Sequence, residues 1–387
     1  MRHYCTYFDS NYMLMGLALY ESLQEHSNEP FTLWVLCFDD ATHTLLTQLQ
    51  LPNLNPIAQA EFEAGDDALV AVKSTRSKVE YYWTCTPSLP LYVLKLRPEI
   101  ETITYLDADL YFYSDPEPVY KLLGTHSLMI LGHRFPPELQ DRDLHGLYNV
   151  SWMIFRRDEQ GMAALQRWRE QCIDWCYARL EDGKFGDQKY LDEWPTRYDK
   201  LIVLEHKGAG IAPWNLAQYE ITKGDAGVKV DELPLVFYHF HRFRMIAANI
   251  FVHGTKSYAN AFPTNYLRQA HIVLIYHPYA VHLKALANRY VPGQLPPFAI
   301  DSVGKQIQMI LQGRAVLVQP RWLAMMISRF ALWRSNGAWL VKQGFHLYQN
   351  REMVQGRRTL MAAAFRSPGL LLNRRFRNVF KATLYRD

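Results

Sequence analysis

Two carboxylates lie in a strand-like segment, ITYLDADLYFYSD, at residues 103–115. In an extended strand, side chains two positions apart point to the same face, so Asp107 and Asp109 are expected to lie side by side. Two like charges on one face destabilise each other unless a cation or several hydrogen-bond donors lie between them. Carboxylate oxygens suit a hard divalent ion such as Mg²⁺ or Mn²⁺, so the pair is a candidate metal site. The alternative is a solvated turn, where Asp-x-Asp pairs are common by chance.

Two histidines form a second group of possible ligands. The segment FYHFHRFR at residues 237–244 alternates like a strand, so His239 and His241 share a face, with Arg242 and Arg244 on the other face or just beyond the strand. A lone histidine is more often a packed core residue than a ligand. Neutral imidazole nevertheless suits Mn²⁺, and we expect one of the two to complete an open site that can hold a diphosphate.

Two polar pairs could contact a ligand beside this site. Asp187 and Gln188 follow Gly186 in a turn, where an acid beside an amide could hydrogen-bond sugar hydroxyls or stabilise a positive anomeric carbon. Asn149 and Ser151 lie at the end of an otherwise apolar strand and could also be ligand contacts. The alternatives are a capped helix start for the first pair and an ordinary strand terminus for the second.

The turn after the first expected strand carries Asp9 and Tyr12. The Tyr12 ring could stack on a nucleotide base and the Asp9 carboxylate could accept a hydrogen bond from it, although Asp9 is equally suited to cap a helix. A sugar nucleotidyltransferase would need a glycine-rich phosphate loop at this position. The chain has Asp9-Ser10-Asn11 instead, which argues against that class of enzyme.

Alternating strands and helices are expected to position these side chains. Hydrophobic runs predict strands at residues 3–8, 31–38, 55–62, 103–113, 127–131, 148–155, 201–204 and 235–240. Helical spacing of apolar residues predicts helices at 12–24, 41–49, 73–96 and 159–180. Strands that alternate with helices at this spacing form an α/β fold with a mostly parallel, doubly wound sheet.

The composition is that of a globular protein with a large core. The 387 residues are 49% hydrophobic, and their five cysteines are too scattered for a disulfide framework, which indicates a reducing compartment. Cys172 and Cys176 are expected to pack on one face of a helix. The apolar run at residues 13–20 is too short to span a bilayer and no signal peptide is recognisable, so we expect a cytoplasmic protein.

The composition changes after the linker VPGQLPP at residues 291–297, which predicts domains at 1–290 and 291–387. Residues 301–387 look helical, and residues 314–387 carry a net charge of +12 against −8 for the rest. This basic region also holds Trp322, Phe330, Trp333 and Trp339. Such helices can bind an anionic membrane surface or nucleic acid, or pack as a layer on the other domain. We favour peripheral attachment to the membrane and expect no nucleic acid partner.

The ordered motifs resemble those of the GT-A fold nucleotide-sugar glycosyltransferases. They are TYFDSNYMLMGLALYESL, YLDADLYF, YNVSWMIF and GDQKYL, followed by a late strand with histidine. The chain is most similar to the retaining branch that includes glycogenin and bacterial lipopolysaccharide galactosyl- and glucosyltransferases, and it looks like the uncharacterised glycosyltransferases of surface-polysaccharide clusters. The resemblance covers residues 1–285 and implies a Rossmann-like mixed sheet, mostly parallel and flanked by helices, with the basic region as an extension.

The resemblance also implies roles for individual residues. Asp107, Asp109 and His239 would bind Mn²⁺ or Mg²⁺, with His241 as the alternative histidine, and Asp187 and Gln188 would be the catalytic residues; Thr6, Asp9, Tyr12, Arg76, Asp107, Asn149, Ser151 and Arg242 would bind the nucleotide sugar. The usual Thr-Asn-Asp turn after the first strand is absent. His241-Arg242 stands where the family commonly has a small residue and a glycine.

The expected function is metal-dependent sugar transfer. The donor would be a nucleoside-diphosphate sugar, with a UDP-sugar as first choice, and the acceptor would be a glycan or lipid-linked hydroxyl in surface polysaccharide synthesis. The resemblance implies retention of the anomeric configuration. Besides the nucleotidyltransferase, the other alternative is a non-catalytic protein that binds glycan or membrane on the same fold.

Overall fold

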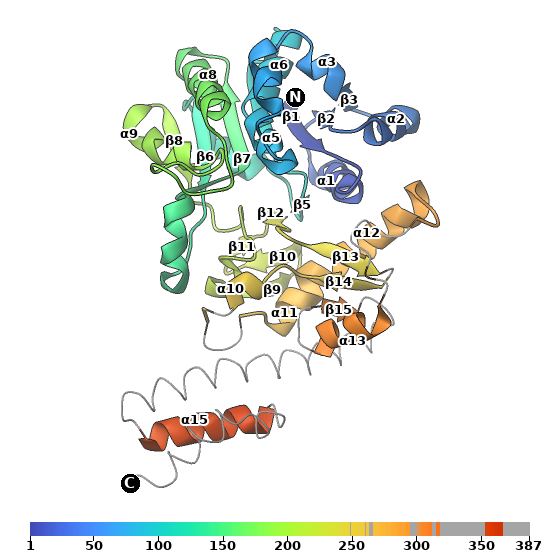
Figure 1. Ribbon diagram of the computed structural model, residues 1–387, viewed down its shortest axis with the longest axis vertical. Helices are drawn as coiled ribbons and strands as arrows, with labels where there is room; N and C mark the ends of the chain where they lie inside the picture. Colours follow the sequence, from blue (N-terminus) through green and yellow to red (C-terminus); the bar gives the residue numbers. More distant parts are fainter. Residues whose placement is uncertain are drawn as a thin grey trace. The chain divides into compact units, whose positions relative to one another are not determined.

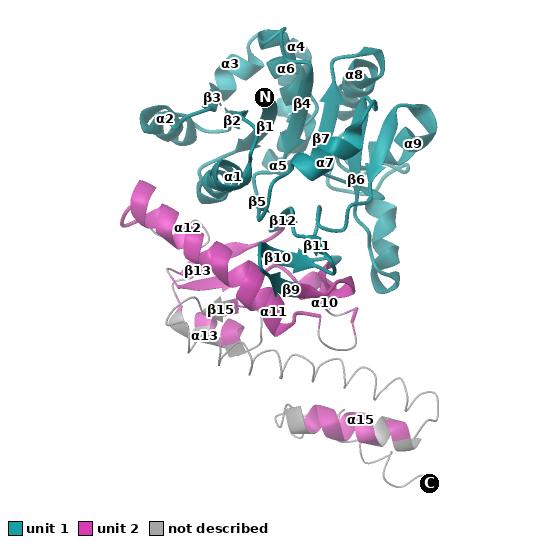
Figure 2. Ribbon diagram, turned by 180° about the vertical axis from the view of Figure 1, so that it is seen from behind, with its two compact units in different colours: residues 1–215, 222–240 teal, residues 216–221, 241–387 magenta. Residues whose placement is uncertain are grey.

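The computed structural model describes residues 1–247, 249–259, 261–262, 266–294, 300, 302–311, 315–317 and 353–366. They form two compact units, which Figure 2 distinguishes by colour. Unit 1 comprises residues 1–215 and 222–240, and unit 2 comprises residues 216–221 and 241–387. The expected boundary at 290/291 therefore falls inside unit 2. The tryptophans of the basic region and Phe330 lie outside the described residues.

A mixed sheet of seven strands forms the centre of unit 1 (Figure 1). Its strands are β1 (Arg2–Phe8), β2 (Phe31–Cys37), β3 (Leu54–Ala58), β4 (Thr102–Leu106), β6 (Leu128–Gly132), β7 (Tyr148–Arg156) and β8 (Leu201–Leu204), in the order β3-β2-β1-β4-β7-β6-β8. Only β7 runs antiparallel to its neighbours. The expected α/β fold with a mostly parallel sheet is confirmed. The carboxyl ends of six strands thus share one edge with the start of β7.

Helices flank this sheet on both faces. They are α1 (Met13–His26), α2 (Asp40–Leu49), α3 (Gln59–Glu63), α4 (Asp67–Lys73), α5 (Lys78–Cys85), α6 (Ser88–Leu96), α7 (Glu117–Leu123), α8 (Glu159–Asp174) and α9 (Trp194–Arg197), with 3-10 helices at Pro137–His145 and Lys189–Glu193. Side chains set several of the starts: Asp39, Asp66 and Asp158 each accept a hydrogen bond from the first turn of α2, α4 and α8.

Three expected elements were wrong in extent. The helix expected at residues 73–96 is divided into α4, α5 and α6, because Ser77 and Glu80 form a capping box that starts a new helix at Lys78. The strand expected at 55–62 ends at Ala58, where α3 begins. Helix α8 ends at Asp174, so Cys176 lies beyond it and does not share its face with Cys172.

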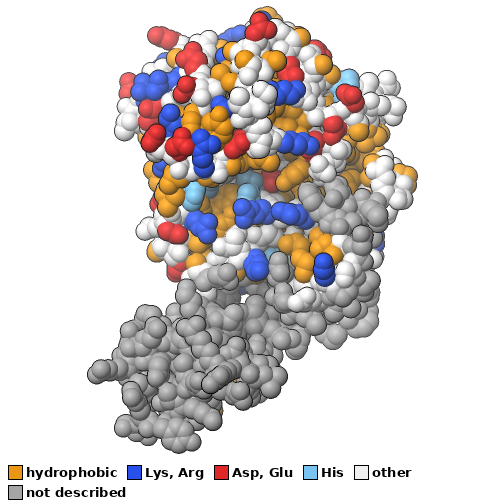
Figure 3. Space-filling model, in the orientation of Figure 1, with side chains coloured by type: hydrophobic (Ala, Val, Ile, Leu, Met, Phe, Trp, Pro, Cys, Tyr) orange, Lys and Arg blue, Asp and Glu red, His pale blue; other side chains and the backbone are white. Residues whose placement is uncertain are grey.

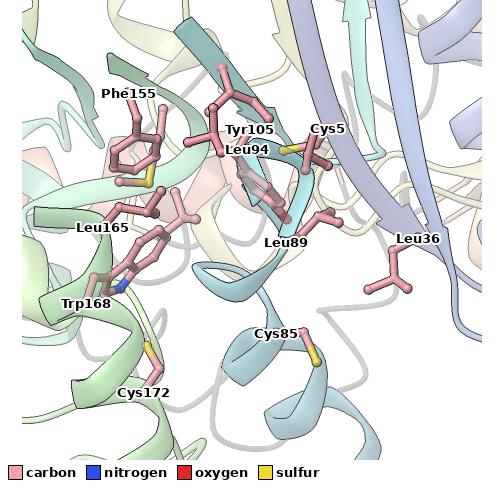
Figure 4. Close-up of a cluster of buried hydrophobic side chains, with 14 of the residues drawn as sticks. Cys5, Leu36, Cys85, Leu89, Leu94, Tyr105, Phe155, Leu165, Trp168 and Cys172 are labelled. Carbon is pink, nitrogen blue, oxygen red and sulfur yellow. The ribbon is translucent and has the colours of Figure 1, made fainter. Parts of the chain in front are cut away.

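The core of unit 1 packs between the sheet and its helices. Figure 4 shows Trp168 and Leu165 of α8 against Phe155 of β7, with Cys5 and Tyr105 nearby on β1 and β4. Burial of such large side chains is the main favourable term in folding. All five cysteines are buried and free, as expected for packing residues. Over the face of unit 1 that Figure 3 shows, acidic and basic side chains are interspersed.

Two small sheets complete the connections. Strands β5 (Leu110–Phe112) and β12 (Phe237–His239) pair antiparallel. Strands β9 (Ile221–Gly224), β10 (Gly227–Val230) and β11 (Leu233–Pro234) form a sheet in the order β11-β10-β9.

Unit 2 combines a small sheet with helices. Its elements are β13 (Arg244–Ala247), β14 (Ile250–Val252), α10 (Lys256–Ala259), α11 (Gln269–His271), a π-helix (Ile272–Tyr276), α12 (His277–Tyr290), α13 (Val303–Leu311), β15 (Ala315–Leu317) and α15 (Met353–Arg366). Strands β13, β14 and β15 are antiparallel, so the expectation of helix throughout 301–387 was wrong at β15. Within the described ranges, none of the helices has the length and apolar character needed to cross a membrane.

Candidate active site

The two central carboxylates lie in a tight turn between two strands. Strand β4 ends at Leu106, and the turn Asp107-Ala108-Asp109 is closed by a hydrogen bond from the Leu110 amide to the Asp107 carbonyl, 3.2 Å long. The continuous strand expected here was wrong, because β4 pairs with β7 whereas β5 leaves the large sheet to pair with β12. The Asp107 amide also donates to the Ser151 carbonyl of β7 at 3.0 Å, which anchors the turn to the sheet edge.

His239 joins the two carboxylates through the pairing of β5 with β12. The register places His239 opposite Leu110, and the Phe240 amide donates to the Asp109 carbonyl at 2.8 Å. The Nε2 atom of buried His239 then lies 3.1 Å from Oδ1 of Asp109 and 3.7 Å from Oδ2 of Asp107. His241 follows two positions along the chain, where the second segment of unit 2 begins, and its role as a ligand stays a prediction.

The electrostatics of this cluster fit a divalent cation. Burial raises the pKa of Asp107 to about 6, and the charge of Asp109 adds to this while His239 and a hydrogen bond from Tyr105 oppose it. The Asp109 and Asp107 charges raise the pKa of His239 although burial lowers it. Two carboxylates and an imidazole make an oxygen-rich donor set of the kind that Mn²⁺ or Mg²⁺ accepts. The residues present therefore fit a metal ion.

Asp187 lies within electrostatic reach of Asp107. Its side chain is buried, and burial raises its pKa to about 7, with a hydrogen bond from Thr86 opposing the rise and the Asp107 charge adding to it. The Trp168 indole donates to the Asp187 carbonyl at 2.8 Å, which fixes the turn to α8. Gly186 before it has a φ of +52°, and a Cβ there would lie 3.2 Å from the Trp83 ring.

The amides expected near the donor are held by protein groups. The Gln188 Nε2 donates to the carbonyl of His145 at 2.9 Å. The Asn149 side chain bridges two partners, since its Nδ2 lies 3.2 Å from Nε2 of His133 and its Oδ1 accepts from the Ser151 amide at 3.1 Å. Ser151 is fully buried. These contacts fix the side chains at the sheet edge, and their roles toward a ligand stay predictions.

The opening turn brings a lysine that the sequence did not assign to the site. Asp9 accepts hydrogen bonds from the Asn11 amide at 3.0 Å and from the Tyr82 hydroxyl at 3.1 Å, and its Oδ2 lies 2.7 Å from Nζ of Lys78. Helix α1 starts after Tyr12 without a side-chain cap, so Asp9 is not its cap. Lys78 is recognised as a neighbour of the site through this contact between α5 and the turn after β1, because no sequence motif around Lys78 indicates it.

The remaining expected ligands lie in three different settings. Thr6 is fully buried in β1, and its hydroxyl has no hydrogen-bond partner among the described residues. Arg76 donates to the Ile173 carbonyl at 3.0 Å and its guanidinium lies 4.0 Å from the Tyr177 ring centroid, so it supports the end of α8. Arg242, in unit 2, is exposed with a φ of +60°. Their roles toward a donor also stay predictions.

Comparison with known proteins shows relatives that carry no assigned function. No family model matches the chain. YfnF of Bacillus subtilis (strain 168), an uncharacterized protein, is 33% identical over 256 residues, which cover 64% of this chain and 83% of YfnF. YfnD of the same organism, also uncharacterized, is 29% identical over 306 residues, which cover 78% of this chain and 95% of YfnD.

Solved structures with a partial likeness to the chain include proteins named as glycosyltransferases. Mouse xyloside xylosyltransferase 1 is 13% identical with a TM-score of 0.40, over 62% of this chain and 98% of its own. The galactosyltransferase LgtC, in complex with donor and acceptor sugar analogs, is 15% identical with a TM-score of 0.39, over 62% of this chain and 90% of its own. Because the chain is 33% identical to YfnF over 83% of the length of YfnF, it belongs to the same family as YfnF.

Proposed function

We propose that this chain is a metal-dependent glycosyltransferase that moves a sugar from a nucleoside-diphosphate donor to an acceptor hydroxyl. The observation that carries the proposal is the meeting of Asp107, Asp109 and His239 at the carboxyl edge of the sheet, with Asp187 buried beside them. Ligands of an α/β sheet bind at this edge. A sugar nucleotide needs a cation site for its diphosphate and polar side chains for its sugar, and the residue types at this edge suit both needs.

Asp107, Asp109 and His239 would hold Mn²⁺ or Mg²⁺, with His241 as an alternative ligand. Once bound, the ion would offset the negative charge that develops on the departing diphosphate. The protein contributes the orientation of the ligands: the Tyr105 hydroxyl donates to Oδ1 of Asp107 at 2.9 Å, and the Ser151 carbonyl holds the Asp107 amide.

The other groups of the edge would bind the donor. Asp187 would face the donor sugar, where a buried carboxylate stabilises positive charge at the anomeric carbon as the leaving group departs. Gln188, Asn149 and Ser151 would complete the sugar side. Thr6, Asp9 and Tyr12 would lie near the nucleoside, Arg76 near the donor, and Arg242 near its phosphates. Lys78, whose ammonium already lies beside Asp9, is a further candidate on the nucleoside side.

The finer features of the reaction rest on the motif resemblance. It supports a UDP-sugar, retention of the anomeric configuration, and a glycan or lipid-linked acceptor in surface polysaccharide synthesis. The charge of +12 over residues 314–387 supports attachment to an anionic membrane at its cytoplasmic face.

Binding and hydrolysis of a panel of nucleotide sugars, with and without Mn²⁺, tests the proposal. Wild type, Asp109→Ala and a control, Asp141→Ala, are compared; the Asp141 side chain is 74% exposed and belongs to the 3-10 helix Pro137–His145. We expect one nucleotide sugar to release its nucleoside diphosphate only with metal, and Asp109→Ala alone to abolish this release. Failure of every nucleotide sugar to bind would refute the function. Full activity of Asp109→Ala would refute the metal site.

A further inference from the structure

A cavity in unit 1 contains none of the residues of the proposed active site. It has a volume of about 530 Å³, within the range of small-molecule sites. Helices α3, α6 and α8, which supply or adjoin its walls, lie at the top of unit 1 in both views (Figures 1 and 2), and Figure 2 labels α4 among them. Its lining residues are Phe62, Ala64, Gly65, Asp66, Ser88, Leu91, Tyr92, Lys95, Leu96 and Arg169.

Helix α6 supplies one wall of this cavity. Ser88, Leu91, Tyr92, Lys95 and Leu96 follow each other at helical spacing and therefore lie along one face. The opposite face of α6 is buried in the core, where Leu89 and Val93 are fully enclosed. The cavity face is therefore fixed in orientation and carries mainly apolar side chains, the hydroxyls of Ser88 and Tyr92, and a single cation, Lys95.

The rest of the lining is held in place by specific contacts. The Tyr92 ring packs edge-on against Phe62 with centroids 5.4 Å apart, and its hydroxyl donates to Glu61 at 2.7 Å. Asp66 accepts from the Leu69 amide at 3.0 Å to cap α4, and Nη2 of Arg169 lies 2.5 Å from its Oδ1. An aromatic wall and a guanidinium are thus presented without a need for rearrangement.

The charges of the lining favour an anion. Among the lining residues, Lys95 and Arg169 oppose the single carboxylate of Asp66, which leaves one positive charge in excess within the lining; the Glu61 carboxylate, held by the Tyr92 hydroxyl, lies just outside it. Arg169 is paired with that carboxylate, whereas the ammonium of exposed Lys95 makes no hydrogen bond or ion pair with any described residue. Lys95 is therefore available to a ligand.

We propose that this cavity binds a small anion built on a ring, with its carboxylate or phosphate at Lys95 and its ring against Tyr92 and Leu91. Such a ligand uses both properties of the lining, the excess positive charge and the apolar wall. A sugar acid and a sugar phosphate share this chemistry. The proposal does not depend on the sugar-transfer activity, since the two sites share no residue.

Calorimetric titration of the full chain, without divalent metal, tests the inference. The probes are glucuronate, glucose 1-phosphate, benzoate, inorganic phosphate and glucose. We expect at least one ring-bearing anion to bind about tenfold or more tightly than phosphate or glucose alone. A preference between glucuronate and glucose 1-phosphate distinguishes the two sources of the anion, and benzoate tests whether a carboxylate on an apolar ring binds without sugar hydroxyls.

Variants assign the binding to this cavity. We expect Lys95→Glu to weaken binding about tenfold or more, and Ala64→Trp, which places a large side chain at an exposed position of the lining, to abolish it. The matched control is Lys121→Glu, the same charge change on exposed α7. Asp109→Ala should bind as the wild type does. Thermal melting confirms that each variant is folded, and Tyr92→Ala replaces Ala64→Trp if the latter is not.

Three results would overturn the proposal. They are no binding of any ring-bearing anion at a concentration of about 10 mM, unchanged binding by Lys95→Glu and by the cavity variant, or loss of binding in Asp109→Ala with retention in Lys95→Glu. The last result would place the anion in the active site instead.

Discussion

Replacement of Trp168 by phenylalanine is expected to destabilise unit 1 and to reduce activity together. Trp168 is fully buried, and its indole donates to the Asp187 carbonyl at 2.8 Å. Its ring packs against Phe155, with centroids 6.3 Å apart, and edge-on against Trp194, with centroids 5.9 Å apart. Phenylalanine keeps part of this packing but removes the hydrogen bond that ties the Asp187 turn to α8.

The magnitude follows from two contributions. A buried carbonyl that loses its donor costs about 1–3 kcal/mol. The smaller ring leaves a cavity against Phe155 and Trp194, which costs about 1–2 kcal/mol at the usual rate per volume. We therefore expect the free energy of unfolding to fall by about 2–5 kcal/mol. Activity is expected to fall because the turn that carries Asp187 loses its anchor, and a small displacement of a reacting group is costly.

Urea unfolding followed by circular dichroism measures the stability, and nucleoside diphosphate release measures the activity. The control is Trp175→Phe, since the Trp175 indole donates at 3.3 Å to Glu181, a side chain 45% exposed. The control should lose only the cavity cost of the smaller ring, about 1–2 kcal/mol, because Trp175 is also buried but water can replace its exposed partner. A loss below about 1 kcal/mol for Trp168→Phe, with unchanged activity, would refute the reasoning.

Three further predictions concern stability. Gly210→Ala should lower the free energy of unfolding by about 2–4 kcal/mol, since Gly210 has a φ of +73° and a Cβ there would lie 2.5 Å from Leu131. The control, Gly183→Ala, has a φ of +72° but open space around it, and should lower the free energy of unfolding by about 1 kcal/mol in the same urea titration. Burial lowers the pKa of His133 to about 3, so on acidification the unfolded state takes up a proton before the folded state does. The free energy of unfolding should therefore fall as the pH drops below about 6.5, by about 2–3 kcal/mol at pH 4.5. His133→Gln should remove this contribution to the pH dependence of stability, and an unchanged pH dependence would contradict the prediction. Asp107→Asn should raise the melting temperature in EDTA at pH 8. Burial and the Asp109 charge raise the pKa of Asp107 to about 6, so ionised Asp107 destabilises the folded protein by about 1–3 kcal/mol at that pH. The variant should also lose the stabilisation by Mn²⁺, and a lower melting temperature in EDTA would contradict the repulsion between Asp107 and Asp109.

The fold could be predicted to a large extent because local patterns determine it. Parallel strands buried on both faces appear as continuous apolar runs, and β1, β2 and β7 begin and end within a residue or two of the expected bounds. Errors arose where a polar side chain changes the backbone path, as at Ser77, or where a strand changes its partner, as after Leu106. Hydrophobic periodicity does not record either event.

The candidate site was predictable in residue type but not in geometry. Asp107 and Asp109 were expected to converge because of strand pleat, yet a turn and the pairing of β5 with β12 bring them to His239. Lys78 and Thr86 were missed, because they reach Asp9 and Asp187 only through packing of α5 and the segment after it against the sheet edge. Contacts between residues far apart in sequence leave no local signal.

The pairing of β5 with β12 has a consequence for how the chain acquires its site. Asp109 and His239 are separated by most of unit 1, so the ligand set is complete only after the last strand of that unit has docked. Closing so long a segment is entropically costly, and a ligand bound only by the native state repays part of that cost by mass action. A bound cation would thus stabilise the contact between two segments that are far apart in the sequence. Cation affinity would then measure how completely unit 1 has folded, and chains truncated before Phe237 would lack a high-affinity site whatever the state of their large sheet.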